Sequence, residues 1–407
     1  MEIKKVMFRQ SKEYACTEVT ERVISLKRRV CAILLAFVLL LPLMAAVRAA
    51  EPEIPAPSAI LIEKTSGKIL YEKNAHEKLA PASVTKIMTL LLVMEALQSG
   101  RISWDDTVTT SSAAAAKGGS QIYLEENEQM PLSDVLKAVV VASANDGATA
   151  LAEHLCGSEA AFVEKMNERA EQLGMQDTHF VNCTGLDDDP DSEEHLTTAY
   201  DIALMSRELL GHEEIKKYTT IWMDSVRDGT FGLANTNKLV RFYDGTTGLK
   251  TGFTSGAGFC LSASAMRDGM ELIAVVLHCD TSANRFESAK TLLNHGFANY
   301  TLVEPKLPHE PEAIPVILGR QMQITPELAE CEPILVSKEQ ASDISYEMEQ
   351  LDSVNAPITQ GQKLGTLTVR SGETVLAEMN LIAPQSVEDL TFWDVFLRML
   401  RTICMSE

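Results

Sequence analysis

The sequence predicts a mixed α/β protein of the α+β class, followed by a small all-β domain. Two observations support this prediction. Strand-like segments lie at both ends of a largely helical region, which implies one sheet assembled from distant parts of the chain. Beyond Tyr300, prolines and short strand-like runs replace the helical periodicity. A chain of 407 residues is also long enough for two or more domains.

The first domain is expected to span residues 50–301. Its strands are predicted at 59–63 and 68–71, on either side of the turn Thr65-Ser66-Gly67, and later at 247–253, 258–266 and 271–278. Its helices are predicted where apolar residues recur at helical spacing, at 83–98, 132–141, 147–155, 160–173, 197–210 and 285–300.

The second domain is expected at residues 302–385 and begins with a linker rich in proline, at Pro305, Pro308, Pro311 and Pro315. Short strands separated by glycine or polar turns are predicted at 314–318, 334–337, 365–369 and 374–381. We find no catalytic constellation in this domain.

The last residues, 386–407, return to a helical period from about Val387. One helix face is apolar and another is charged, with Trp393, Phe396, Leu400 and Ile403 on the first and Asp394, Arg398 and Arg401 on the second. The segment is too short and too charged to span a bilayer, so we expect a helix that lies in the membrane interface. The alternative is a helix that packs on its own protein or on a partner.

Residues 1–49 have the pattern of a secretory signal. Lys27-Arg28-Arg29 precede an apolar run at 30–47, and small residues follow, so cleavage is expected after Ala49. The run is also just long enough to be an uncleaved membrane helix, but Pro42 and the alanines after it favour cleavage. We therefore expect an exported protein attached peripherally to the outer face of the cytoplasmic membrane.

Composition excludes several function classes. A net charge of −21 and a pI near 4.9 argue against nucleic-acid partners, which require a basic surface. The six cysteines beyond the signal are widely spaced, and we expect buried thiols rather than disulfides. No cluster of residues has metal-ligand spacing, so we expect neither a metal nor another cofactor.

The first of three short motifs with candidate chemistry is Ser83-Val84-Thr85-Lys86, which Pro81-Ala82 place at the start of a helix. Ser83 and Lys86 are three residues apart, so their side chains share a face. Enclosure by apolar neighbours lowers the pKa of a lysine toward the range of a base, which a serine nucleophile requires. The helix N-terminus adds positive potential for a developing oxyanion. Taken alone, the motif also fits a helix-capping serine beside a surface lysine.

The second motif, Ser143-Ala144-Asn145, lies between two predicted helices. A turn at this point presents Ser143 to relay a proton and Asn145 to hold a substrate amide. Serine and asparagine are also common helix caps, and further Ser-x-Asn copies occur at 282–284 and 353–355. Of the three copies, only the first lies between the other two motifs, which favours it.

The third motif, Lys250-Thr251-Gly252, lies on a predicted strand flanked by glycines. A glycine there permits a bound peptide to approach and pair with the strand edge, while the lysine and threonine can hold a terminal carboxylate. The backbone N–H groups of Ser83 and Phe253 are candidates for an oxyanion hole. The alternative is an ordinary exposed strand with a solvated lysine.

Together the motifs resemble those of the low-molecular-mass penicillin-binding proteins, which are serine-type D-alanyl-D-alanine carboxypeptidases. The resemblance extends to the flanking residues 81–89, 143–146, 195–201 and 248–254, and it covers about residues 57–300. It implies a β-lactamase/transpeptidase-like antiparallel sheet with a helical subdomain. A β-rich second domain and an amphipathic tail are also typical of this family.

The resemblance implies a role for each candidate residue. The catalytic residues are the nucleophile, its base and a proton relay, namely Ser83, Lys86 and Ser143. The substrate-binding residues are Asn145, Lys250, Thr251, Gly252, Phe253 and Arg285, of which Arg285 is assigned by position alone. Some family members have histidine in place of Phe253, but the chemistry needs only the backbone N–H there.

We therefore expect an enzyme that removes the terminal D-alanine from peptidoglycan stem peptides through an acyl-serine intermediate. It is expected to be inhibited covalently by β-lactam antibiotics and to act in peptidoglycan biosynthesis and cell shape. A β-lactamase is less favoured, since no Glu-x-x-Leu-Asn segment lies between the second and third motifs. A non-catalytic penicillin-binding sensor is the other alternative, but such sensors are joined to transmembrane signalling segments.

Overall fold

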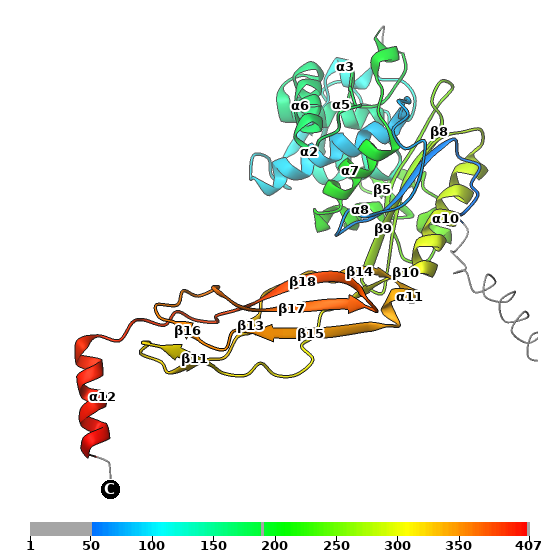
Figure 1. Ribbon diagram of the computed structural model, residues 1–407. Helices are drawn as coiled ribbons and strands as arrows, with labels where there is room; N and C mark the ends of the chain where they lie inside the picture. The colour runs from blue at the N-terminus through cyan, green and yellow to red at the C-terminus, as the bar shows by residue number, and fades with distance from the viewer. Residues whose placement is uncertain (1–50, 189–190, 405–407) are drawn as a thin grey trace, which may run out of the picture. The chain divides into compact units, whose positions relative to one another are not determined.

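The computed structural model describes residues 51–188 and 191–404, with side chains described up to residue 401 (Figure 1). The signal segment predicted at 1–49 lies outside the described residues. Among the cysteines whose side chains are described, all are free thiols. Cys183, Cys260 and Cys279 are buried as predicted, Cys156 is half-buried, and the prediction is wrong for the exposed Cys331.

One antiparallel sheet of five strands organises the first domain, in the order β2-β1-β9-β8-β7. The strands are β1 (Ser58–Glu63), β2 (Ile69–Lys73), β7 (Thr246–Thr254), β8 (Gly258–Arg267) and β9 (Met270–Cys279). Because β1 pairs with β9, segments more than 200 residues apart in sequence meet in the middle of the sheet. The predicted assembly of one sheet from the two ends of the domain is confirmed.

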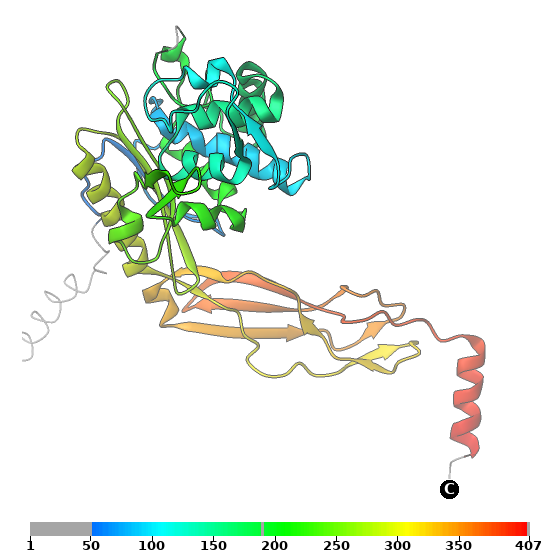
Figure 2. The ribbon, with the colours of Figure 1, turned by 180° about the vertical axis from the view of Figure 1, so that it is seen from behind.

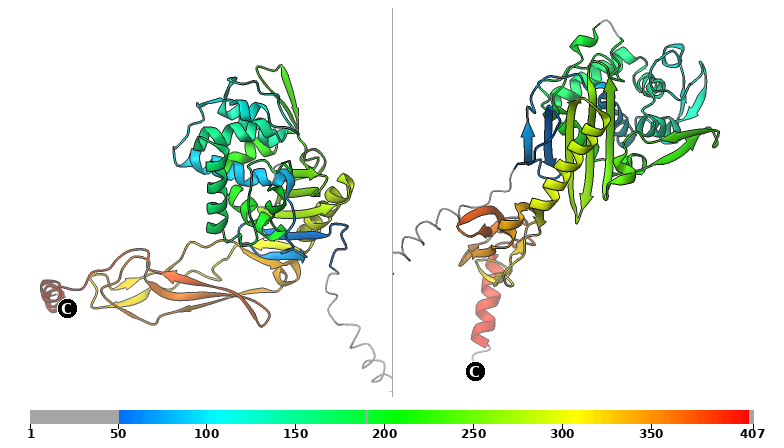
Figure 3. Two further views of the ribbon diagram at one scale, coloured as in Figure 1. Left: turned by 90° about the horizontal axis from the view of Figure 1, so that it is seen from above. Right: turned by 90° about the vertical axis from the view of Figure 1, so that its right-hand side faces the viewer.

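The sheet is covered on both faces, since successive residues of a strand point to opposite sides. Ile60 of β1 packs with the helical subdomain, whereas the next residue, Leu61, packs with α10 (Ser282–Asn299). Figure 3 shows α10 on one side of the strands and most of the domain's helices on the other side. The main helices of that side are α2 (Lys86–Gln98), α4 (Leu132–Val141), α5 (Asn145–Cys156), α6 (Glu159–Gln172) and α7 (Ala199–Leu209).

Shorter elements complete this domain. The single-turn helices are η2 (Ala82–Thr85), α3 (Ser112–Ala115), η3 (Ser192–Glu194), η4 (Glu213–Ile215), α8 (Lys216–Thr219) and α9 (Leu239–Phe242). Two small two-stranded sheets were not indicated by the sequence patterns. One pairs β3 (Thr107–Thr109) with β4 (Gln129–Pro131), and the other is a hairpin of β5 (Met223–Val226) and β6 (Phe231–Ala234).

The second domain is built from β-strands (Figure 2). It has an apolar core of its own. One sheet has the order β13-β18-β17-β15 and another the order β12-β11-β16. A third ladder pairs β10 (Tyr300–Val303) with β14 (Ile334–Ser337). The other elements are β11 (Ile314–Ile317), β12 (Gln323–Ile324), β13 (Glu327–Leu328), α11 (Lys338–Ala341), β15 (Ile344–Gln350), β16 (Val354–Asn355), β17 (Lys363–Ser371) and β18 (Thr374–Ile382).

The terminal helix α12 (Phe392–Cys404) begins later than the helical period predicts. Val387, where that period starts, is only 2% exposed in the core of the second domain and pairs with Ile358. The predicted boundary at residue 386 is therefore a few residues too early. Within the described ranges, we find no helix that has both the length and the apolar character needed to cross a bilayer.

Candidate active site

The first motif forms a tight turn that leads directly into the buried helix α2. Residues Ala82–Thr85 form η2, and Lys86 is the first residue of α2. Ser83 is half-buried, while Lys86 is fully buried. Lys86 Nζ lies 3.0 Å from Ser83 Oγ, so the predicted shared face brings the two groups into hydrogen-bonding contact.

The environment of Lys86 favours its neutral form. Its Nζ donates to Asn145 Oδ1 at 2.5 Å and to the Thr184 carbonyl at 2.7 Å, and neither acceptor is charged. Burial lowers the pKa of Lys86 from its ordinary 10.5 to about 7, against a smaller opposite effect of Cys183 and Asp146. A lysine with this pKa can accept a proton at neutral pH.

The second motif lies at the junction of α4 and α5, as predicted. Asn145 is the first residue of α5, and its side chain bridges Lys86 to the Gly118 carbonyl, to which Nδ2 donates at 2.7 Å. Ser143 has a left-handed backbone with φ of +62° and is 4% exposed. Among the described residues, no hydrogen bond joins the Ser143 hydroxyl to Ser83 or Lys86.

The third motif lies on β7, which is the outer strand of the sheet, beside the turn that holds Ser83. A β-carbon at Gly252 would lie 2.6 Å from the Pro81 carbonyl oxygen and 3.1 Å from the Ser83 nitrogen. Only glycine allows the two backbones to approach this closely. The backbone of β7 at Gly252 and Phe253 is thereby placed next to the nucleophile.

Lys250 and Thr251 are buried, which excludes the solvated-lysine interpretation of this motif. Lys250 Nζ donates to the Thr251 carbonyl at 2.8 Å, and Thr251 Oγ1 donates to Thr236 Oγ1 at 2.7 Å. Burial, with the nearby positive charges of Lys86 and Arg285, lowers the pKa of Lys250 well below its usual range. An incoming anion would relieve this charge crowding.

Phe253 and Arg285 lie at the margin of this group. Phe253 is 55% exposed and its ring packs in a tilted arrangement against Phe259 of β8, with ring centroids 4.3 Å apart. Arg285 Nη1 donates to the Gly252 and Cys260 carbonyls at 2.9 and 3.3 Å, and the side chain is largely buried. Arg285 therefore supports the backbone of the third motif from behind.

Comparison with family models identifies the chain. Residues 45–281 match the model described as D-alanyl-D-alanine carboxypeptidase, which is more than half of the chain. The chain belongs to the D-alanyl-D-alanine carboxypeptidase family. Residues 310–389 match the C-terminal domain of penicillin-binding protein 5. The chain is thus a serine-type D-Ala-D-Ala carboxypeptidase of low molecular mass, and the predicted resemblance is confirmed.

Individual relatives agree with this assignment over most of their length. The chain is 42% identical to the D-alanyl-D-alanine carboxypeptidase DacF of Bacillus subtilis over 85% of this chain and 89% of that protein. It is 33% identical to DacC of Escherichia coli over 85% and 90%. Penicillin-binding protein 5 of Haemophilus influenzae superposes with a TM-score of 0.71 at 30% identity, covering 84% of this chain and 100% of the other.

Three buried residues of this carboxypeptidase contact the motifs but were not predicted as site residues. Asp146 accepts hydrogen bonds from the backbone N–H groups of Ile122 and Leu124, and so anchors the loop that carries Gly118. Thr184 offers its carbonyl to Lys86, and His195 Nε2 lies 2.8 Å from Thr85 Oγ1. Contacts made by backbone carbonyls or by side chains far apart in sequence have no characteristic residue spacing, so they could not be predicted from the motifs. His195 and Asp146 do, however, lie within the segments that carry the resemblance.

Proposed function

We propose that this carboxypeptidase acts through an acyl-enzyme at Ser83, with Lys86 as its general base. The observation that supports this most directly is the buried Lys86 amine, 3.0 Å from Ser83 Oγ and with a pKa of about 7. The amine takes the hydroxyl proton as Ser83 Oγ attacks the carbonyl carbon of the penultimate D-alanine. The oxyanion that forms would be bound by the backbone N–H groups of Ser83 and Phe253.

In the second half of the reaction, the peptide bond breaks and the leaving amine of the terminal D-alanine takes up a proton. We assign this proton delivery to Ser143, which lies just before α5. Ser143 would pass to the leaving amine the proton that Lys86 took from Ser83, so that Lys86 becomes neutral again. A water molecule then attacks the acyl carbonyl, and Ser83 and the shortened peptide are released. The low pKa of Lys86 allows it to serve as base again in this hydrolysis.

Substrate binding is assigned to β7 and its neighbours. The stem peptide would pair with the outer edge of β7 at Gly252 and Phe253, since a free strand edge offers unpaired backbone groups. Lys250 and Thr251 would hold the terminal carboxylate, with Arg285 adding positive potential from below the strand. Asn145 would bind a substrate amide beside the nucleophile.

We also propose that β-lactam antibiotics acylate Ser83. A structure of penicillin-binding protein D2 of Listeria monocytogenes in the ampicillin-bound form is 33% identical to this chain, with a TM-score of 0.56. It covers 61% of this chain and 99% of the other. A β-lactam presents a strained amide and a carboxylate, which are the two features that the proposed site would bind.

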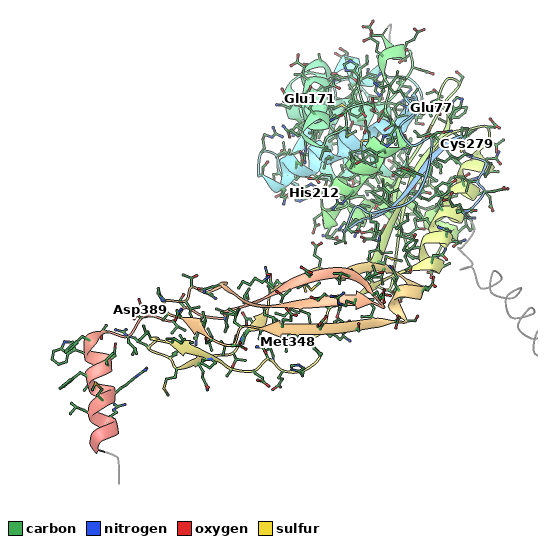
Figure 4. The ribbon with its side chains drawn as sticks, viewed as in Figure 1. Glu77, Glu171, His212, Cys279, Met348 and Asp389 are labelled. Atoms are coloured by element: carbon green, nitrogen blue, oxygen red, sulfur yellow. The ribbon has the colours of Figure 1, made fainter. Side chains whose placement is uncertain are left out.

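In the cell, we propose that the protein is exported and trims peptidoglycan stem peptides at the outer face of the cytoplasmic membrane, with a role in wall synthesis and cell shape. The support is the signal-like N-terminal sequence and the amphipathic helix α12. Polar contacts join α12 to the second domain, as in the pair of Arg320 with Asp394. The large apolar side chains of α12 that the structure describes, up to residue 401, are exposed, including Trp393 and Phe396. Figure 4 shows side chains standing out around this helix.

The direct test is release of D-alanine from a peptide that ends in D-Ala-D-Ala. We expect release by the wild-type protein and none by Ser83→Ala, and mass spectrometry of a penicillin adduct should place the label on Ser83. Acylation without release would support the non-catalytic sensor instead. Rapid turnover of penicillin without D-alanine release would support the β-lactamase. Labelled penicillin that still binds covalently to Ser83→Ala would overturn every mechanism based on this serine.

A further inference from the structure

A buried turn outside the three motifs supplies one of the acceptors of Lys86. The turn at residues 182–186 belongs to no helix or strand. Its Thr184 carbonyl accepts a hydrogen bond from Lys86 Nζ at 2.7 Å, and Thr184 is fully buried. A backbone carbonyl has no freedom of its own, so its direction depends on whatever fixes the peptide plane.

The peptide plane is fixed by one side chain. Asn182 Oδ1 accepts from the backbone N–H of Gly185 at 2.7 Å and from the N–H and hydroxyl of Thr184, both at 3.1 Å. Asn182 Nδ2 donates to the Leu186 carbonyl at 3.0 Å. Asn182 is 1% exposed, so water does not compete for these bonds.

The bond to Gly185 has a direct geometric consequence. The Gly185 N–H and the Thr184 C=O belong to the same peptide unit, and in a trans peptide they point in opposite directions. When Asn182 holds the N–H on one side, the carbonyl is aimed at the other side, where Lys86 Nζ lies. Asn182 and Lys86 are therefore hydrogen-bonded to opposite ends of the same peptide unit.

The same turn is packed against the nucleophile. Gly185 has φ of +78°, and a β-carbon there would lie 1.9 Å from the Ala82 carbonyl oxygen and 2.7 Å from Thr85 Oγ1. Ala82 itself has a left-handed backbone with φ of +49°. The turn 182–186 and the turn that bears Ser83 are thus in direct backbone contact, and a shift of one would displace the other.

We propose that Asn182 is a positioning residue for the general base Lys86. A neutral lysine amine has two N–H bonds and one lone pair. The Asn145 oxygen and the Thr184 carbonyl accept the two N–H bonds, and this leaves the lone pair directed at Ser83 Oγ. By aiming the Thr184 carbonyl, Asn182 determines where that lone pair points. The inference rests on the proposed roles of Ser83 and Lys86.

The proposal predicts a change in titration as well as in rate. Without the Thr184 acceptor, the charged ammonium loses more than the neutral amine, because a charged donor makes the stronger bond. Asn182→Ala should therefore lower the pKa of Lys86. In the pH profile of the acylation rate, the acid limb, where the rate rises with pH, should then move to lower pH. With the lone pair no longer directed, the limiting rate should fall by about 10- to 100-fold. Asn182→Asp keeps an acceptor for Gly185 but adds a negative charge, so its acid limb should move to higher pH.

The experiment measures the rate constant of acylation by a fluorescent penicillin across the pH range, per titrated active site, on the full-length protein. The matched control is Asn167→Ala. The Asn167 side chain is hydrogen-bonded to the backbone N–H and carbonyl of Phe180, in the segment that leads into the turn, but it does not contact the turn 182–186. The control should lower the melting temperature and leave the acid limb in place.

Two results would overturn the proposal. One is an Asn182→Ala protein whose acid limb and limiting acylation rate per active site equal those of the wild type. If that variant does not fold, an unshifted limb in Asn182→Asp has the same meaning. The assay on Ser83→Ala separates this failure from failure of the proposed function, since labelling of Ser83→Ala would reject the serine mechanism itself. A merely structural Asn182 would reduce the number of active sites without moving the limb.

Discussion

The side-chain oxygen of Asn145 lies 2.5 Å from Lys86 Nζ, while the nitrogen of the same amide donates to the Gly118 carbonyl at 2.7 Å. The second motif is therefore joined to the first through the base, and the amide orientation is determined by the Gly118 acceptor. An asparagine offers a neutral oxygen to the lysine, so it orients the amine without stabilising the ammonium as a carboxylate would.

This contact gives the first prediction, which concerns Asn145→Asp. The new carboxylate would raise the pKa of Lys86, and fewer molecules would have a neutral base at pH 7. We expect the acylation rate by labelled penicillin to fall about tenfold or more at pH 7 and to recover partly at pH 9. Asn299→Asp, which makes the same change at the far end of α10, is the matched control. Equal losses at both pH values would contradict this account.

The second prediction concerns the pH dependence of the wild-type enzyme. Burial lowers the pKa of Lys86 to about 7, so the ammonium predominates below pH 7 and the neutral base above it. The acylation rate should rise about tenfold per pH unit below the pKa and level off above it. His195 does not provide an alternative source of this limb, since burial lowers its pKa to about 4. A midpoint near 10 in a stopped-flow pH profile would show that Lys86 has an ordinary pKa.

The third prediction is steric and concerns Gly252→Ala. The added methyl group would meet the Pro81 carbonyl oxygen at 2.6 Å, so β7 and the Ser83 turn must separate. We expect acylation to fall by about 100-fold or more, because small misplacements of reacting groups have large kinetic effects. Gly232→Ala is the control, since no atom lies within 4 Å of a β-carbon there. Similar penicillin labelling rates in the two variants would argue against close approach of these backbones.

The sequence predicted most of the fold because the apolar periods are strong where burial is complete. The α4 bounds at 132–141 agree with the structure, and the three late strands are each within one residue of the predicted ends. The hairpin of β5 and β6 was missed because its exposed residues give no alternating pattern. In the site, the spacing of Ser83 and Lys86 predicted their contact, whereas Thr184 contributes a backbone carbonyl that any residue possesses.

The fourth prediction concerns folding stability and His195. Its Nδ1 accepts from the Val181 N–H at 3.1 Å, so Nε2 carries the proton that is donated to Thr85 Oγ1. Burial, followed by His179 and Lys86, lowers the pKa of His195 from 6.5 to about 4. Between these values the unfolded chain binds a proton that the folded protein does not, so stability decreases as the pH falls from 6.5 to 4.

The size of this effect follows from the shift and amounts to about 3 kcal/mol in the free energy of unfolding. His195→Gln has no titration in this range but can still donate to Thr85. Its unfolding free energy, measured by urea denaturation, should therefore decline less than that of the wild type between pH 7 and pH 4. Parallel declines in the two proteins would show that His195 titrates normally in the folded state.

The fifth prediction concerns the proposed membrane attachment by α12. Because Val387 is part of the core of the second domain, a clean deletion begins at Thr391 rather than at Val387. Removal of 391–407 should move the protein from the membrane fraction to the soluble fraction and leave the rate of penicillin acylation unchanged. A deletion from Val387 would also remove part of the core of the second domain, so loss of membrane attachment could not be told apart from damage to that domain.

Substitutions within α12 test the role of its apolar face while the helix keeps its full length. Trp393→Ser combined with Phe396→Ser removes two exposed rings, and we expect binding of the full-length protein to lipid vesicles to weaken at least about tenfold. Met322→Ser removes a side chain of comparable exposure outside α12 and is the matched control. If the doubly substituted protein sedimented with vesicles as strongly as this control, the apolar face of α12 would not be the surface that contacts lipid. The alternative, a helix that packs on its own protein or on a partner, would then be favoured.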